Sequence, residues 1–425
     1  MRVSKNLVGL AIVMSVGVTA AMAESLEGRW DATVTIRGTV IPFRLDLAGE
    51  AASFTGTLFN GDIPVTPTAA KFENGTVTLN FEHYLTKIVA KVKDGQLEGT
   101  VAGRFGDQDR YISSNPFHAK RYVAPAAAEA KAPNIDGLWV IPYDSPKGEK
   151  AWRFIARQNG AEVSAAILRV DGDTGALTGA WRDTKFLLSH FDGSRPALME
   201  ITPKPDGTLD ILQNGRLTNK LVAYRPEVAQ AKGLPEPANF MTHTTVRDAN
   251  ETFAFRFPDV NGKMLSNEDP KFKGKVVVAI ITGTWCPNCH DEAQYLVPLY
   301  KKYRDQGLEI VALDFEEPEQ QDQLKRVKAF VDKYGVEYTY LIAGAPVEMW
   351  EKVPQLINLN TWPATVFVGR DGKVRAIHAG FAAPASGEFN LELKQEFTST
   401  IERLLAEKVG DQNASTGLGQ EIAAR

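Results

Sequence analysis

Short apolar runs alternate with segments of helical periodicity in the C-terminal part of the chain. The run at residues 275–282 is rich in β-branched residues and is typical of a strand buried on both faces. After it, apolar residues recur at helical spacing as far as Gly307, and Pro298 inside this predicted helix should kink it. The same patterns predict strands at 308–313, 338–343, 364–368 and 374–379, helical segments at 319–334, 347–350 and 391–408, and a hairpin turn at Asp371-Gly372.

Residues 25–225 have a different pattern. Short segments of alternating hydrophobicity, rich in Gly, Thr and Val, are separated by Asn-Gly and Asp-Gly pairs, which favour tight turns. The pattern predicts antiparallel β structure throughout this region. In its first half the expected strands are 33–36, 43–47, 54–59, 77–81 and 88–92.

Two parts of this β region resemble each other. The tripeptide Gly-Arg-Trp at 28–30 recurs as Gly-Leu-Trp at 137–139. The run DGQL at 94–97, followed by Gly-Arg at 103–104, recurs as DGTL at 206–209, followed by Gly-Arg at 215–216. The offsets of 109 and 112 residues predict an internal duplication. Each copy could close its own small barrel, or the two could form one larger barrel or sandwich; we favour two similar, adjacent β-units.

The β region carries no visible catalytic constellation. Its histidines, His83, His118 and His190, are far apart in the sequence and are expected to be structural or exposed. We expect the region to position a client protein or to mediate dimerisation, and the sequence leaves both roles open.

Changes in composition mark the predicted domain boundaries. A basic start, an apolar run from Leu7 to Ala21 and an Ala-x-Ala site ending at Ala23 predict a signal peptide and hence export, most simply to a bacterial periplasm. Stretches that contain proline predict two linkers. The predicted order is signal peptide 1–23, β-unit 24–123, linker 124–133, second β-unit 134–225, linker 226–244, α/β domain 245–409 and disordered tail 410–425.

Composition and charge narrow the classes of function. Of the 425 residues, 44% are hydrophobic and 24% are charged, which suffices for two or three folded domains. A formal net charge of −4 gives no support for nucleic acid or an anionic membrane as partner. No segment after the signal peptide approaches 18 consecutive apolar residues, so we expect no insertion into a membrane.

The chain contains only two cysteines, and they lie together in Trp285-Cys286-Pro287-Asn288-Cys289. A two-residue gap lets both sulfurs meet across the first turn of a helix and form a reducible disulfide. Pro287 suits the first helical position, where its missing N–H would have no partner. Cys286 then lies at the helix N-terminus, where unpaired N–H groups and the helix dipole stabilise a thiolate. This pattern predicts a redox site rather than a structural disulfide.

The predicted order of elements is βαβα, then a β-hairpin, then a last helix, which is a thioredoxin-like pattern. The overall fold class expected is therefore a multidomain chain in which an α/β thioredoxin-like domain follows an antiparallel all-β region. The thioredoxin fold has a cis-proline at the start of the strand that faces the two sulfurs. Pro363, next to Trp362, is at this position, and we predict a cis peptide bond there.

Residues 251–408 resemble the TlpA/ResA-like thiol–disulfide oxidoreductases, the extracytoplasmic branch of the thioredoxin superfamily. The resemblance covers a little over a third of the chain. It is carried by FPDVNGK at 257–263, FKGK at 272–275, GTWCPNC at 283–289 and Asp291-Glu292.

The resemblance implies a role for each site residue. Cys286 would be the exposed attacking nucleophile, and Cys289 would be the buried thiol that resolves the mixed disulfide. Glu292 matches a family glutamate that assists proton transfer from the second thiol, although an exposed helix charge is an equal alternative. The buried carboxylate of classical thioredoxin would fall at Ile280, which is apolar, so proton transfer must use Glu292, solvent or another group.

Three further residues near the cysteines have expected roles. Trp285 should shield the nucleophile and, with Trp362, offer a surface for substrate contact. His290, if protonated, would favour the thiolate and make the disulfide more oxidising. We favour the alternative, in which His290 is exposed on the polar face of the helix.

The leading function is that of a protein-disulfide reductase. Its expected partners are a client protein with a disulfide and a membrane thiol electron donor; in the resembled family the clients include apocytochrome c and copper-protein cysteines. No cofactor and no metal is expected, and the oligomeric state stays open. A disulfide donor with the same residues is an alternative, because the CPNC motif alone does not fix the direction of exchange.

Three other functions stay open. A thiol peroxidase has the same fold, but the Pro-x-x-x-Thr-x-x-Cys loop of peroxiredoxins lacks its proline here. Cu(I) binding by the two cysteines with His290 or His378 is a second alternative. In the third, the β region binds a ligand or partner and the redox domain is accessory.

Overall fold

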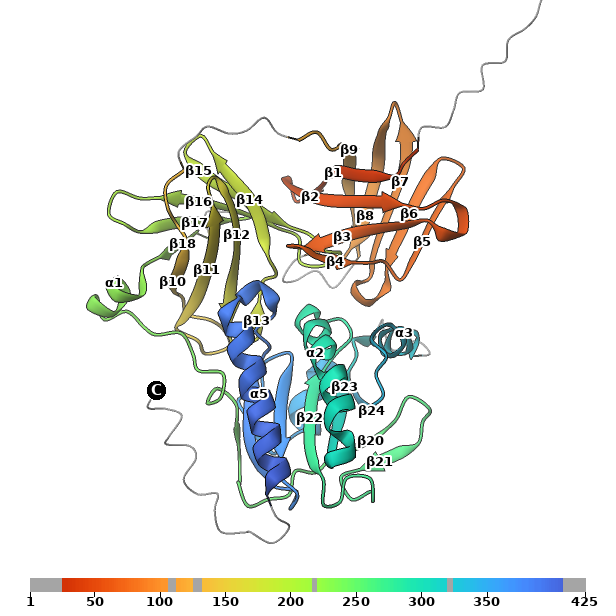
Figure 1. Cartoon of the computed structure of the whole chain (residues 1–425), viewed down its shortest axis with the longest axis vertical. Coiled ribbons are helices and arrows are strands. Elements are labelled where there is room, and N and C mark those ends of the chain that lie inside the picture. Colours follow the sequence, from red (N-terminus) through yellow and green to blue (C-terminus); the bar gives the residue numbers. More distant parts are fainter. Residues whose placement is uncertain (1–24, 106–111, 125–131, 216–219, 319–323, 408–425) are drawn as a thin grey trace, which may run out of the picture.

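The computed structural model describes residues 25–105, 112–124, 132–215, 220–318 and 324–407. The predicted signal peptide and tail, Arg216 of the repeat and most of the first predicted linker lie outside these ranges. Figure 1 shows three folded parts: two β-units lie side by side, and an α/β domain lies beneath them. Within the described residues, no helix is long and apolar enough to cross a membrane.

The first β-unit is a nine-stranded antiparallel sheet around its own core. Its strands are β1 (Gly28–Ile36), β2 (Thr39–Ala48), β3 (Thr55–Asn60), β4 (Ile63–Val65), β5 (Ala69–Glu73), β6 (Thr76–Phe81), β7 (Thr86–Lys93), β8 (Gln96–Gly103) and β9 (Ser113–Arg121). They are arranged in the order β4-β3-β2-β1-β9-β8-β7-β6-β5. All five strands predicted for this unit are present, but each differs from its predicted bounds by at least one residue.

The second β-unit is a separate nine-stranded sheet with a separate core. Its strands are β10 (Gly137–Pro142), β11 (Ala151–Asn159), β12 (Glu162–Arg169), β13 (Gly172–Asp173), β14 (Leu177–Arg182), β15 (Lys185–His190), β16 (Ala197–Pro203), β17 (Leu209–Gln213) and β18 (Lys220–Ala223). Reciprocal backbone hydrogen bonds of 2.8 and 2.9 Å between Val140 and Tyr224 bring its first and last strands together. The two units are therefore adjacent and do not form one larger barrel.

The repeated Gly-x-Trp motif begins the first strand of each unit. The indole N–H of Trp30 donates to Leu26 O at 3.0 Å, and that of Trp139 donates to Ile135 O at 2.9 Å. A guanidinium group covers each indole, Arg121 over Trp30 and Arg225 over Trp139. These matching contacts agree with the predicted duplication, which itself stays a prediction.

The α/β domain contains a five-stranded sheet in the order β24-β23-β22-β26-β27, in which β26 and β27 are antiparallel to their neighbours. The strands are β22 (Val276–Thr282), β23 (Leu308–Phe315), β24 (Thr339–Gly344), β26 (Ala364–Val368) and β27 (Val374–Ala379). The helices are α2 (Pro287–Tyr303), α3 (Lys325–Tyr334), α4 (Met349–Lys352) and α5 (Glu388–Ala406). The thioredoxin-like order predicted from the sequence is confirmed.

Alternate residues of β22 face two different cores, because successive side chains of a strand point to opposite faces. Val276, Val278 and Ile280 pack with α2, α3 and α5. Val277, Ala279 and Ile281 pack with α4 and with phenylalanines of the segment before the sheet. All seven residues of β22 are buried, as its unbroken apolar run predicts.

Several boundaries of the α/β domain differ from the predictions by one or two residues, and three differences are larger. Helix α5 begins three residues early, directly after Gly387, whose φ of 62° ends the preceding turn. Helix α3 begins at Lys325, and residues 319–323 of the predicted helix lie outside the described residues. The predicted linker at 226–244 contains α1 (Pro226–Ala231), whose Ala229 packs against Val140 and Ala151 of the second β-unit. Small two-stranded pairings complete the domain: β19 (Thr245–Val246) with β25 (Leu356–Ile357), and β20 (Arg256–Pro258) with β21 (Met264–Ser266).

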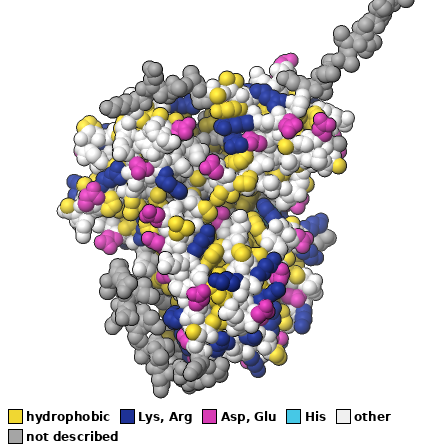
Figure 2. All heavy atoms as spheres, viewed as in Figure 1, with side chains coloured by type: hydrophobic (Ala, Val, Ile, Leu, Met, Phe, Trp, Pro, Cys, Tyr) yellow, Lys and Arg dark blue, Asp and Glu magenta, His cyan; other side chains and the backbone are white. Residues whose placement is uncertain are grey.

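The three parts contact one another directly. Ala176 N donates to the Asn60 side chain at 2.7 Å, which joins the two β-units. Arg104 of the first unit forms an ion pair with Glu317 of the α/β domain. On the face shown in Figure 2, basic and acidic side chains are interspersed over all three parts, without a large field of one sign.

Candidate redox site

The cysteine pair lies where β22 meets α2. Cys286 is the N-cap residue of α2, with extended backbone, and Pro287 is at the first helical position, as predicted. Cys289 N donates to Cys286 O at 3.1 Å, so both cysteines share the first turn. Cys286 is 4% exposed and Cys289 is 1% exposed. The expectation of an exposed Cys286 is therefore wrong for this conformation.

The loop before β26 lies opposite the cysteines. The Trp362–Pro363 peptide bond is cis, as predicted. The Cys286 thiol donates to Trp362 O at 3.5 Å. The Trp285 ring packs edge-on against the Trp362 ring, with centroids 5.2 Å apart, and its indole N–H donates to Phe315 O at 2.9 Å. Both tryptophans thus lie beside Cys286, each partly exposed.

Glu292 is buried, not a solvated helix charge. It is 1% exposed, and the Thr365 hydroxyl donates to its carboxyl group. Burial raises the pKa of Glu292 to about 8, against a lowering contribution from Thr365. Thr365 pairs in register with Ile280 on the neighbouring strand. The Glu292 carboxyl group therefore lies over the part of β22 where Ile280 provides no carboxylate of its own.

Cys289 has properties suited to a resolving thiol. Burial first, and then a hydrogen bond with Cys286, raise the pKa of Cys289 well above its usual range. Its hydrogen bond with Thr282 acts in the opposite direction. Attack by Cys289 consequently requires a group that removes its proton, and Glu292 is one helical turn away.

His290 is buried, at 3% exposure, so the expectation of an exposed histidine is wrong. Its Nε2 lies 2.7 Å from Thr284 O, and its Nδ1 lies 2.7 Å from the Tyr334 hydroxyl. Because a carbonyl only accepts, Nε2 carries the proton and Nδ1 accepts from Tyr334. Burial, and then the nearby His83, lower the pKa of His290 well below its usual range. A neutral His290 does not supply the positive charge considered in the sequence analysis.

Two acidic residues behind the cysteine loop were missed from the sequence. Glu316 accepts hydrogen bonds from Thr284 N at 2.6 Å and from Thr284 Oγ1 at 2.9 Å, which fixes the residue before Trp285. Asp314 accepts from the Tyr340 hydroxyl at 3.2 Å. Burial, and then Glu316, raise the pKa of Asp314 well above its usual range. Their position at the carboxyl end of β23, beside the end of β22, was the available signal.

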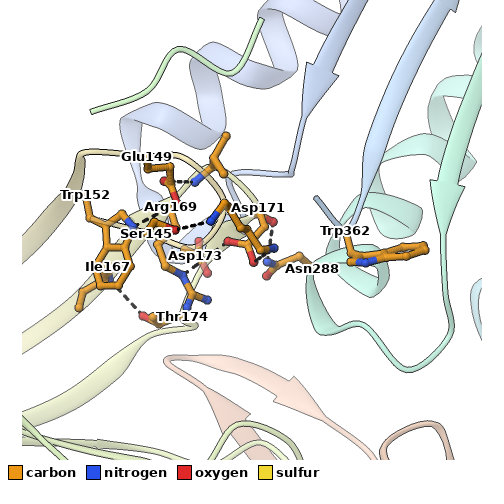
Figure 3. Close-up of polar contacts among 12 residues, drawn as sticks. Ser145, Glu149, Trp152, Ile167, Arg169, Asp171, Asp173, Thr174, Asn288 and Trp362 are labelled. Carbon is orange, nitrogen blue, oxygen red and sulfur yellow. Dashed lines mark hydrogen bonds and ion pairs between the residues drawn. The ribbon is translucent and has the colours of Figure 1, made fainter. Parts of the chain in front are cut away.

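The second β-unit contributes to the site, which the sequence did not indicate. Asn288, between the two cysteines, is 5% exposed. Its amide group donates to Asp171 O at 2.9 Å, and its oxygen accepts from Arg195 Nη1 at 3.0 Å. Figure 3 shows Asp171 against Asn288, with Trp362 on the side away from the β-unit. Both polar atoms of this side chain are thus held by the β-unit.

The histidines considered as copper ligands have other partners. Both ring nitrogens of His290 are hydrogen-bonded, and His378 Nδ1 lies 3.0 Å from Gly380 O. Among the residues that the structure describes, no group of three or more His, Cys, Asp or Glu side chains is placed to hold a metal ion. Nothing in this geometry favours the copper alternative.

We expect replacement of His378 by asparagine to remove an acid sensitivity of the fold. Burial lowers the pKa of His378 from 6.5 to about 4, although Glu396 lies 4.0 Å from its Nε2. As the pH falls, the His378 side chain is therefore protonated in the unfolded chain before it is protonated in the folded protein. Stability is lost as the pH falls from about 6.5 to about 4. When the pH is lowered from 7 to 4, the free energy of unfolding measured in urea should fall by about 3 kcal/mol more in the parent than in His378→Asn. The exposed His118→Asn variant is the control, and equal losses in all three proteins would contradict the assignment.

Comparison with known proteins places this site in a family context. Residues 249–377 match the AhpC/TSA family model. ResA, a thiol-disulfide oxidoreductase of Bacillus thuringiensis, is 33% identical over 120 residues, which are 28% of this chain and 62% of that protein. ResA of Halalkalibacterium halodurans is 28% identical over 154 residues, 36% of this chain and 81% of that protein. The C-terminal domain is a thioredoxin-superfamily domain similar to ResA.

Solved structures also match this domain. A thiol:disulfide interchange protein of the thioredoxin family from Chlorobium tepidum is 20% identical, with 38% of this chain and 99% of that chain covered and a TM-score of 0.28. A DsbF homologue from Corynebacterium diphtheriae is 17% identical, with 38% and 92% covered and a TM-score of 0.30.

Proposed function

We propose that this chain is an exported thiol–disulfide oxidoreductase that reduces disulfides of client proteins. The observation that carries the proposal is the placement of Cys286 at the N-cap of α2, with the buried Cys289 in the first turn and the buried Glu292 one turn further along. The relatives that match this domain are named thiol-disulfide oxidoreductases. These relatives match only part of this chain, so the activity of the whole protein is proposed here.

The reaction has two exchange steps. In the first, the Cys286 thiolate attacks one sulfur of the client disulfide, forms a mixed disulfide and releases the other client sulfur as a thiolate. In the second, Cys289 loses its proton and attacks the Cys286 sulfur. The Cys286–Cys289 disulfide forms, and the second client sulfur leaves. Two electrons and two protons pass from the protein to the client, and an external dithiol, which we expect in the membrane, restores the reduced pair.

Glu292 has a positioning and proton-transfer role in the second step. With a pKa of about 8, its carboxyl group is mostly protonated at pH 7 but ionises within reach of physiological pH. General bases work best when their pKa is close to the working pH. The carboxylate form accepts the Cys289 proton, and Thr365 holds the group in place.

Insulin reduction and the reduction potential test the proposal. Reduced full-length protein should reduce insulin disulfides with one turnover per dithiol, and Cys286→Ser should reduce none. Equilibration with thiol buffers should give a reduction potential of about −270 mV for the Cys286–Cys289 pair, as in thioredoxin. A value near about −120 mV would instead indicate a disulfide donor and overturn the proposed direction. A parent protein as inactive as Cys286→Ser would overturn the activity.

A further inference from the structure

A turn of the second β-unit lies directly on the redox site. Residues 170–173, which we name the cover turn, follow β12 directly and end with the two residues of β13. Gly172 forms a β-bridge with Phe381, just after β27. A Cβ atom on Gly172 would lie 2.4 Å from Asn288 Nδ2 and 2.5 Å from Phe381 O. On the other side, a Cβ on Gly380 would lie 2.3 Å from Val170 O. Two glycines thus permit a contact between backbones that no larger residue would allow.

Polar contacts hold the cover turn in place. Besides the bond from Asn288 to Asp171 O, the Ser386 hydroxyl donates to the Asp173 carboxylate at 2.7 Å. The turn is also held by its own unit: Val170 N donates to Glu149 at 2.7 Å, and Lys147 forms a 2.8 Å ion pair with Asp171. The cover turn is therefore held on one side by its own β-unit and on the other by the α/β domain.

Chemistry at Cys286 requires space that this arrangement does not leave. A mixed disulfide places a client sulfur about 2.05 Å from the Cys286 sulfur, followed by the client's Cβ and backbone. Cys286 has Trp362 O beside its thiol, and both it and its neighbour Asn288 are almost fully buried. The cover turn contacts Phe381 and Asn288, which is two residues from Cys286, so a folded client that approaches this sulfur would meet the turn.

We propose that the cover turn is an intramolecular lid over the redox site, and that it must leave Asn288 and Phe381 before Cys286 reacts. This proposal rests on the proposed function for its biological meaning, but the covering of Cys286 is testable without it. Leu168, two residues before the turn, is packed in the same core as α2 and α5. The displacement is therefore expected in residues 170–173 and not in the whole β-unit. The rate at Cys286 is then the rate of the open state multiplied by the fraction of open molecules.

The variant Gly172→Ala tests the lid. An added Cβ forces the turn away from Asn288 and Phe381, and the φ of 118° at this position adds strain. Gly207→Ala is the matched control, because Gly207 is a turn glycine of the same β-unit with φ of 82° and open space around its Cβ position. Alkylation of Cys286 by iodoacetamide in the reduced full-length proteins, quantified by peptide mass spectrometry, should be at least about tenfold faster in Gly172→Ala than in Gly207→Ala or the parent. Equal rates in the three folded proteins would overturn the lid.

A second variant covers the case in which Gly172→Ala does not fold. Ser386→Ala removes the bond to Asp173 without touching the cysteine helix, and should speed alkylation by at least about threefold. If Cys286 in Ser386→Ala is alkylated at the parental rate, the lid proposal is overturned.

Insulin reduction separates the lid from the proposed function. Faster alkylation with no insulin reduction in any variant would support the lid and overturn the reductase. Insulin reduction by the parent with unchanged alkylation in the variants would support the reductase and overturn the lid.

Discussion

Replacing Cys289 by serine is expected to convert the protein from a turnover catalyst into a covalent trap for its clients. The mixed disulfide at Cys286 should still form, but no second thiol is positioned to release it. Well-oriented intramolecular groups act with effective concentrations of about 10⁵–10⁸ M, far above any external thiol. Insulin turnover should therefore fall at least about a thousandfold. A protein–insulin adduct should appear on non-reducing gels and disappear with dithiothreitol.

The matched control for this trap is Cys286→Ser, which keeps the other thiol. Cys289 is buried within the first turn of α2, and its pKa is raised well above the usual range, mainly by burial. This variant should form no adduct. An adduct through Cys289, or turnover in Cys289→Ser within tenfold of the parent, would contradict the assigned roles of the two sulfurs.

The core of the α/β domain could be predicted from the sequence because its signals are local. The apolar run of β22, the two-residue cysteine gap and the Asp371-Gly372 turn each specify structure within a few residues. The bounds of β26 and β27 were predicted without error. In the first β-unit, the one for which individual strands were predicted, strands β4, β5, β8 and β9 were missed. Strand β4 has three residues, β8 contains glycines and β9 contains a proline, all of which weaken the alternating pattern.

The burial of the site could not be predicted, because the residues that cause it are distant in the sequence. Asn288 and Asp171 are 117 positions apart, and His290 packs against His83 of the first β-unit with ring centroids 5.1 Å apart. Helical periodicity places His290 on a face of α2, but it does not reveal that another domain covers that face. The exposed His290 of the sequence analysis is wrong for this reason.

These contacts also change the expected role of the β region. Positioning a client protein or mediating dimerisation, the two roles expected from the sequence, does not require binding of a side chain between the two cysteines. Asp171 and Arg195 bind both ends of the Asn288 amide, and Tyr84 packs against the ring of His290. Both β-units therefore belong to the environment of the dithiol, and variants of the residues that contact α2 should alter chemistry at Cys286.

Replacing Glu292 by glutamine should change both stability and the pH dependence of the resolving step. Burial raises the pKa of Glu292 from 4.5 to about 8, so the folded protein binds a proton that the unfolded chain has already lost. The parent therefore loses stability as the pH rises from about 4.5 to about 8, whereas glutamine does not titrate. Over this pH range, the free energy of unfolding measured in urea should fall by on the order of 3–5 kcal/mol more in the parent than in Glu292→Gln. The control is Glu351→Gln, at an exposed position, whose stability should depend on pH in the same way as that of the parent.

The same substitution should slow release of the client. Removing a general base typically costs about 10²–10⁴ in rate, and the parent should use this base increasingly as the pH approaches 8. Stopped-flow measurement of mixed-disulfide decay should show a rate that rises through about pH 8 in the parent. In Glu292→Gln the rate should be at least about a hundredfold lower at pH 8, with formation of the mixed disulfide unchanged. A decay rate within threefold of the parent would assign proton transfer to solvent and leave Glu292 as a structural residue.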